Sequence, residues 1–282
     1  MTRFRVPDVV VAGAQKAGTT GLFRSLGAAP GVATPTAQEA MFLHRDQPWN
    51  DWCEEYVGEA FPPDHLIAIK LATLIYFPDS IERLRRLNPS AKLLVVLRHP
   101  VDRMVSLHQF LTAIGIERRP LADALAADDL MPGSGYRLAT YSGGSRYADA
   151  LQSLSQTVSA GQVLVQSQHD VMTAEGLADV ARFVGLPAAI PLVRANESGA
   201  PRSAALGRVL QNPRVKAAVR TVIPAERRQR GRTLVRRLNT GSKPATAGLV
   251  PPDLRARLLE RHAVDVDAAE VALGRALPEW RA

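Results

Sequence analysis

The chain has 282 residues, of which 46% are hydrophobic and 22% charged, and it contains 20 Gly and 20 Pro. A chain of this size and composition can bury a large core, and neither wholesale disorder nor a fibrous repeat fits it. The single cysteine, Cys53, excludes an intrachain disulfide and a cysteine-based zinc cluster. No stretch is long and apolar enough for a secretion signal or a membrane span, which predicts a cytoplasmic location.

The net charge of +8 is concentrated late in the chain. Between Arg202 and Arg237 there are eleven Lys or Arg residues, and Glu226 is the only acid. Such a segment is typical of a solvated helical face or of a surface that contacts an anionic partner. Nucleic-acid binding is a third interpretation, but the chain carries no nucleic-acid-binding signature and few aromatic residues.

Predicted strands and helices alternate along the chain. Short apolar runs, typical of buried strands, lie at residues 9–12, 92–97 and 163–166. Apolar residues at helical spacing lie at residues 21–26, 80–87, 101–111, 175–184 and 254–277. This alternation predicts an α/β fold of three layers, with a central parallel sheet flanked by helices.

We expect residues 1–282 to form a single domain. Residues 188–252 are less regular and rich in Arg, Pro and Gly, which is typical of a cap or lid segment. In open parallel sheets ligands bind at the carboxyl ends of the strands, so the segments that follow the predicted strands are the first place to look for a site.

The segment after the first strand reads Gly13-Ala-Gln-Lys-Ala-Gly-Thr-Thr20. A glycine-rich turn between a strand and a helix presents backbone N–H groups to an anion, and the helix dipole adds roughly half a positive charge. The glycines fit the P-loop pattern G-x-x-x-x-G-K-[ST], but Thr19 replaces its lysine and the cation is Lys16. The predicted nucleotide-binding residues of this loop are Gly13, Gln15, Lys16, Ala17, Gly18, Thr19 and Thr20.

This loop resembles the 5′-phosphosulfate loop of sulfotransferases that use 3′-phosphoadenosine 5′-phosphosulfate (PAPS), a P-loop-related family with a P-loop-like fold. The resemblance implies that Lys16 and the loop amides hold the 5′-phosphate and the bridging oxygen, that adenosine 3′,5′-bisphosphate (PAP) is the product, and that no metal is needed. A sulfuryl donor has no γ-phosphate to clamp with magnesium, so one lysine at the leaving oxygen can neutralise the charge that develops there.

The same family holds the 3′-phosphate with an arginine after a second buried strand and a serine eight residues later. Here Arg98 follows the strand at residues 92–97, and Ser106 lies eight residues on. Arginine offers planar donors that suit a phosphate. The resemblance therefore assigns the 3′-phosphate to Arg98 and Ser106.

Transfer to an alcohol or amine needs a base near the attacking atom. The segment at residues 34–42 is similar to the Lys-Glu-Pro-x-Phe-Phe stretch of heparan-sulfate-type and many bacterial sulfotransferases, although its lysine and proline are missing here. The resemblance puts Glu39 in the role of catalytic base. His44 is the rival base, and His99 and His108 are weaker candidates.

Three further positions carry a weaker resemblance. Lys70 is similar to the lysine of a family Lys-x-Pro-x-Tyr segment, where it would support the transferring sulfuryl group; alternatively, it only ends a buried strand. Tyr147 belongs to a Gly-x-Tyr-like stretch, which implies a wall of the site. Arg202 lies in a segment similar to a late loop over the nucleotide, where it would reach the 3′-phosphate.

The resemblance implies sulfuryl transfer from PAPS to a hydroxyl or amine of a small-molecule, lipid or glycan acceptor. A P-loop kinase is one alternative, but it would need lysine in place of Thr19 and a carboxylate for magnesium. A non-catalytic nucleotide-binding or nucleic-acid-binding protein that uses the basic late segment is the other. The acceptor cannot be identified from sequence, since the aromatic residues Trp49, Trp52, Tyr56 and Phe61 fit either an acceptor wall or ordinary core.

Overall fold

The computed structural model describes residues 4–37, 39–57, 61–129, 138, 140–193 and 250–281. These residues form two compact units. The first takes the described residues of Met1–Pro100, Gly144–Ala195 and His262–Ala282, and the second those of Val101–Gly143 and Asn196–Arg261. Most of the cap that the sequence predicts at 188–252 lies outside the described residues, and the single-domain organisation stays a prediction.

The first unit contains a five-stranded sheet in which every pairing is parallel. The strand order is β2-β3-β1-β4-β5, so the strand before the glycine-rich loop is the central one. The strands are β1 (Val9–Gly13), β2 (Val32–Ala33), β3 (Leu66–Lys70), β4 (Lys92–Leu97) and β5 (Val163–Ser167). This sheet confirms the predicted α/β class, because parallel strands need helical crossovers that cover both faces.

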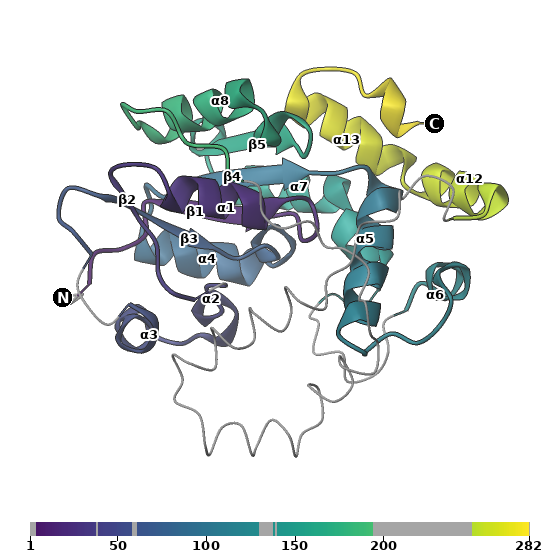
Figure 1. Ribbon diagram of the computed structural model, residues 1–282, viewed down its shortest axis with the longest axis horizontal. Coiled ribbons are helices and arrows are strands. Elements are labelled where there is room, and N and C mark those ends of the chain that lie inside the picture. Colours follow the sequence, from purple (N-terminus) through teal and green to yellow (C-terminus); the bar gives the residue numbers. More distant parts are fainter. Residues whose placement is uncertain are drawn as a thin grey trace, which may run out of the picture. The chain divides into compact units, whose positions relative to one another are not determined.

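Helices cover the sheet on both faces (Figure 1), with α1 in front of it and α4 and α7 behind it. The helices of this unit are α1 (Thr19–Gly27), α2 (Phe42–Arg45), α3 (Trp49–Tyr56), α4 (Pro78–Leu87), α7 (Tyr147–Thr157), α8 (Ala174–Val184) and α13 (Ala263–Leu273). Short 3-10 turns lie at Leu74–Tyr76, Ala160–Gln162, Asp170–Met172 and Pro278–Trp280. None of the described helices has the length and apolar composition that a membrane span requires.

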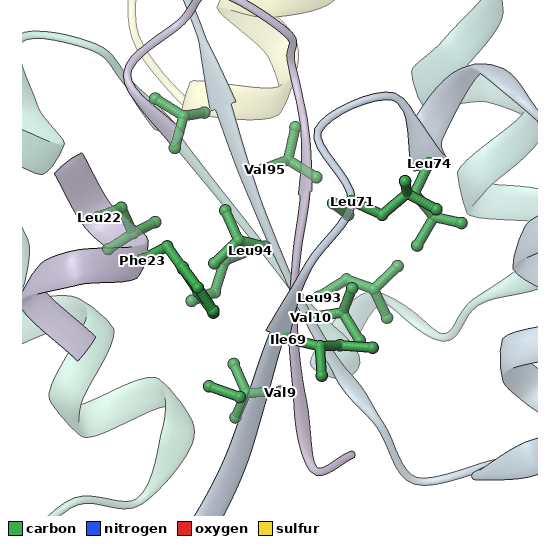
Figure 2. Packing of buried hydrophobic residues seen from close by; sticks show 14 of the residues in the cluster. Val9, Val10, Leu22, Phe23, Ile69, Leu71, Leu74, Leu93, Leu94 and Val95 are labelled. Atoms are coloured by element: carbon green, nitrogen blue, oxygen red, sulfur yellow. The ribbon is translucent and has the colours of Figure 1, made fainter. Parts of the chain in front are cut away.

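The core of the first unit follows from the alternation of side chains along the strands. Val10 of β1 lies in register with Ile69 and Leu93, so the three share one face of the sheet. Figure 2 shows Leu22 and Phe23 of α1 on the opposite side from these residues. Every residue of β1 is buried, as expected for a strand with helices on both faces. The glycine-rich loop therefore starts from a rigid strand.

The aromatic residues of α2 and α3 belong to this core. Trp49 and Trp52 are buried and stack with ring centroids 5.5 Å apart, and Phe42 packs 5.2 and 5.1 Å from them. Tyr56 lies 5.4 Å from Trp52. The sequence allows these residues to form either an acceptor wall or part of the hydrophobic core, and their contacts fit the hydrophobic core.

The predicted strands and the helices before residue 254 are found within a few residues of their expected ends. The helical pattern at 254–277 differs, because the chain forms two helices, α12 (Pro252–Arg261) and α13, with a break at His262. Helix α13 then ends at Gly274, whose φ of 66° is left-handed and cannot continue a helix. The helical pattern that the sequence shows at 254–277 is therefore divided between two helices.

In the second unit the described residues form α5 (Pro100–Ala113), whose first residue belongs to the first unit, α6 (Leu121–Ala127) and α12. Its own apolar cluster includes Val105, Leu111, Leu125, Tyr141 and Leu258. A salt bridge joins Arg255 of α12 to Asp102 of α5 at 3.5 Å. The unit thus has both a core and a polar contact between its helices.

Glu117 is a carboxylate inside this unit, with none of its side chain exposed. It accepts hydrogen bonds from the Arg119 side chain at 2.7 and 3.0 Å, from the N–H groups of Arg118 and Arg119 at 2.9 Å, and from the Tyr141 hydroxyl at 2.8 Å. Burial alone would raise the pKa of Glu117, but these donors outweigh it and hold the pKa at about 2.

Replacing Glu117 should therefore make the second unit less stable and less sensitive to acid. A carboxyl with a normal pKa of 4.5 when unfolded and about 2 when folded stabilises the protein above pH 4.5, and this stabilisation is lost as the pH falls toward 2. Glu117→Gln should lower the free energy of unfolding at neutral pH by about 3 kcal/mol. Urea unfolding between pH 2 and 7 checks this, with the exposed Glu260→Gln as control; equal stability of the two variants would contradict it.

Candidate active site

The glycine-rich loop connects β1 to α1 at the carboxyl end of the central strand. The Ala14 N–H donates to the Val96 carbonyl of β4 at 2.7 Å, and the Ala17 N–H donates to the Ala14 carbonyl at 3.1 Å. Helix α1 follows with no acidic residue in its first turn. The partial positive charge of the helix N-terminus is therefore uncompensated there, as an anion site requires.

Backbone conformation explains why the loop has this sequence. Gly18 precedes α1 with a φ of 102°, which favours glycine. Lys16 adopts a φ of 71° although it carries a side chain. Non-glycine residues in the left-handed region are rare and cluster at functional sites. Gly13 is also constrained, because a Cβ there would lie 2.9 Å from Ile75.

Lys70 is the buried cation next to this loop, with 4% of its side chain exposed at the end of β3. Its ammonium lies 3.2 Å from the Thr20 hydroxyl and 2.8 Å from Glu39 Oε1. Glu39 Oε2 accepts a hydrogen bond from the Ala72 N–H at 2.9 Å. About a third of the Glu39 side chain, 34%, is exposed. The structure thus brings together three of the predicted site residues, which come from separate segments of the sequence.

His44 lies in a different environment. It is buried, and its Nδ1 lies 2.8 Å from the Ser80 hydroxyl while its Nε2 lies 2.8 Å from the Thr73 hydroxyl. Its ring packs edge-on against Phe77 at 4.7 Å. Both ring nitrogens are engaged by protein hydroxyls, so His44 is tied into the packing of α4 and the turn after β3.

Arg98 follows β4 and reaches the glycine-rich loop directly. Its Nη1 donates to the Lys16 carbonyl at 3.2 Å. Its own carbonyl accepts a hydrogen bond from the hydroxyl of Tyr147 at 2.7 Å. The two sequence signatures for phosphate binding, about 80 residues apart in the chain, are therefore in contact in the first unit.

The other predicted residues have surroundings of their own. Ser106 and His108 belong to α5 in the second unit, where His108 Nε2 lies 3.0 Å from the Arg119 carbonyl. His99 is buried and its ring packs 6.2 Å from that of Trp280. Gln15 stays within the loop, with its Oε1 atom buried. Arg202 lies outside the described residues.

Sequence reasoning missed Gln168, whose side chain lies against the glycine-rich loop. A Cβ on Gly18 would lie 3.4 Å from Gln168 Cγ. The Gln168 N–H donates to the Leu97 carbonyl at 2.7 Å, which fixes the residue at the end of β5. Its place directly after a buried strand is the signal that could have identified it.

A comparison with protein families shows which family the chain belongs to. Residues 6–195, which include the glycine-rich loop, Glu39, Lys70 and Arg98, match the sulfotransferase domain family. The chain belongs to this family. The matched segment contains the glycine-rich loop between β1 and α1 and the arginine after β4 that the sequence analysis singled out.

Individual relatives are distant. Heparan sulfate glucosamine 3-O-sulfotransferase 5 of Homo sapiens is 26% identical over 106 residues, or 36% of this chain, and the Mus musculus protein of the same name gives the same figures. The match covers only 30% of the length of those proteins. The similarity to these two proteins is therefore limited to the 106 aligned residues.

Solved structures agree on the fold. A sulfotransferase from Alicyclobacillus acidocaldarius superposes with a TM-score of 0.70 at 18% identity and covers 99% of this chain and 100% of its own. A mouse sulfotransferase, SULT7A1 complexed with PAP, gives 0.51 at 13% identity over 96% and 88% of the two chains. The chain therefore has a P-loop-like sulfotransferase fold.

Gly18→Ala should disturb the loop more than a single added methyl group would suggest. A side chain at this left-handed position costs roughly 1–2 kcal/mol, and the new Cβ would contact the Gln168 side chain at 3.4 Å. We expect a lower melting temperature and weaker PAP binding, measured by calorimetry. Gly161→Ala, which meets no neighbour within 4 Å, is the control. Unchanged PAP affinity in Gly18→Ala would contradict a role for this conformation in binding.

Proposed function

We propose that this protein transfers a sulfuryl group from PAPS to a hydroxyl or amine and releases PAP. The observation that carries the proposal is the buried ammonium of Lys70, which contacts both Thr20 of the glycine-rich loop and Glu39. One cation thus links the group that would hold the donor to the group that would activate the acceptor. Membership in the sulfotransferase family and the PAP-bound mouse relative support the same reaction.

The residues of the loop suit the donor. Lys16, Lys70 and Arg98 supply three cationic side chains, and the start of α1 adds backbone N–H groups. The 5′-phosphate and sulfuryl oxygens would lie against the loop amides, Lys16 and Thr20. Arg98 would hold the 3′-phosphate, and Arg202 and Ser106 remain predicted contributors on the grounds of sequence alone.

The reaction needs a base but no external oxidant or reductant. Glu39 accepts the proton of the acceptor hydroxyl or amine while the acceptor atom forms a bond to sulfur. The bond between sulfur and the bridging oxygen breaks, and its electron pair stays on the 5′-phosphate of PAP. Lys16 and Lys70 stabilise the negative charge that develops on this oxygen, because charge-assisted donors in a water-poor site act where charge appears.

The contacts of the two candidate bases favour Glu39 over His44. Glu39 is partly exposed and adjoins Lys70, so an acceptor can reach it. His44 is buried, and both of its nitrogens already face hydroxyl groups. We therefore propose Glu39 as the base and a structural role for His44.

The acceptor is proposed only as a class. Relatives named for 3-O-sulfation of glucosamine favour an alcohol, and a small-molecule, lipid or glycan alcohol remains consistent with the site. We also propose a cytoplasmic location, because the sequence shows no stretch that is long and apolar enough for a secretion signal or a membrane span. The kinase alternative is disfavoured because Thr19 occupies the position of the P-loop lysine.

PAP should bind without magnesium, and Arg98 should contribute to its affinity. Loss of a charged hydrogen-bond donor typically costs about 1.5–3 kcal/mol, so Arg98→Ala should weaken PAP binding by roughly 10- to 150-fold. Isothermal titration calorimetry in EDTA measures both effects, and the exposed Arg182→Ala is the matched control. Tight ATP binding that requires magnesium would instead support the kinase alternative.

Glu39→Gln should remove turnover and leave PAP affinity within a few-fold of the parent protein. A general base contributes roughly 10²–10⁴-fold to the rate, and glutamine cannot accept the proton. Transfer from labelled PAPS to a panel of alcohols and amines measures the rate, with the exposed Glu82→Gln as control. Full activity of Glu39→Gln together with an inactive but folded His44→Gln would move the role of base to His44.

A further inference from the structure

The hydroxyl of Tyr147 fixes the backbone of Arg98. It donates to the Arg98 carbonyl at 2.7 Å, and the Arg98 N–H donates to the Tyr147 hydroxyl oxygen at 3.4 Å. Tyr147 is completely buried, with 0% of its surface exposed. A side chain without exposed surface acts through the residue that it holds.

The direction of the Arg98 side chain depends on this anchored backbone. Arg98 is the first residue after β4, where the regular strand hydrogen bonds end. On the other side, its guanidinium donates to the Lys16 carbonyl at 3.2 Å. The Tyr147 hydroxyl thus holds the backbone of Arg98, and the Lys16 carbonyl holds its guanidinium.

The C-terminal part of the first unit holds Tyr147 in turn. Tyr147 opens α7, and the next N–H, that of Ala148, donates to Asp265 of α13 at 3.0 Å. The buried His262 lies 2.6 Å from the second oxygen of this carboxylate. The ring of Trp280 packs 6.5 Å from that of Tyr147. A carboxylate at a helix N-terminus is stabilising, so α13 fixes the start of α7.

We propose that Tyr147 is a positioning residue for the 3′-phosphate of the donor nucleotide, and that α13 and the turn at Pro278–Trp280 support it. Its hydroxyl keeps the Arg98 backbone in the orientation from which the guanidinium meets the 3′-phosphate. This inference rests on the proposed function, in which Arg98 binds that phosphate. It assigns a role in nucleotide selectivity to a residue that acts through the backbone of Arg98.

The test compares two nucleotides that differ only in the 3′-phosphate, PAP and adenosine 5′-monophosphate (AMP). Tyr147→Phe removes only the hydroxyl. Loss of one hydrogen bond should weaken PAP binding by about three- to tenfold, while AMP affinity changes less than about twofold. With saturating acceptor, the KM for PAPS should rise and kcat should stay close to that of the parent protein.

Tyr141→Phe is the matched control. Tyr141 is also completely buried and also uses its hydroxyl as a donor, but its partner is Glu117 in the second unit. It should lower the melting temperature without changing the ratio of PAP to AMP affinity. Should Tyr147→Phe not fold, Trp280→Phe reduces the ring that packs on Tyr147 and should lower the same ratio to a smaller extent.

The outcomes separate this inference from the proposed function. A parent protein that binds PAP and AMP equally would remove the 3′-phosphate site itself and with it the proposed donor. A parent protein that prefers PAP, with Tyr147→Phe keeping the full preference, would overturn only the role of Tyr147. Equal weakening of PAP and AMP would also overturn it, because Tyr147 would then support the whole loop.

Discussion

The site depends on the ion pair between the buried ammonium of Lys70 and the carboxylate of Glu39. Removing a cation from water is costly unless it is paired and hydrogen-bonded, and here Glu39 and Thr20 provide both. Lys70 therefore needs these partners, because losing Glu39 would leave an uncompensated charge in the interior. The contacts of this one ammonium join the glycine-rich loop, the end of β3 and the segment around Glu39.

The parallel sheet makes this arrangement possible. β1, β3 and β4 are adjacent and buried, so the three segments that leave their carboxyl ends emerge side by side. The loop follows β1, Lys70 is the last residue of β3, and Arg98 follows β4. Two sequence signatures that each predict phosphate binding can thus meet, and a hydrogen bond runs from Arg98 to the carbonyl of Lys16.

Local signals in the sequence predicted the parts of the fold with strong patterns. The run of residues 92–97 and the glycine spacing at Gly13 and Gly18 each specify a structure within a few neighbouring residues. The two-residue strand Val32–Ala33 has no such periodicity and was not predicted. The pairing of Glu39 with Lys70 depends on how strands are ordered, which no short window of sequence encodes. The contact of Gln168 with the loop was missed for the same reason.

The plane of the Glu39 carboxylate is fixed, since one oxygen is held by Lys70 and the other by the Ala72 N–H. A carboxylate has about four lone-pair directions, and two of them are used in this way. With Glu39 as the base that we propose, an acceptor hydroxyl has to approach along one of those that remain. On a polyol whose hydroxyl groups have similar acidity, the direction of approach would then decide which hydroxyl is modified, so regioselectivity would follow from the orientation of the base.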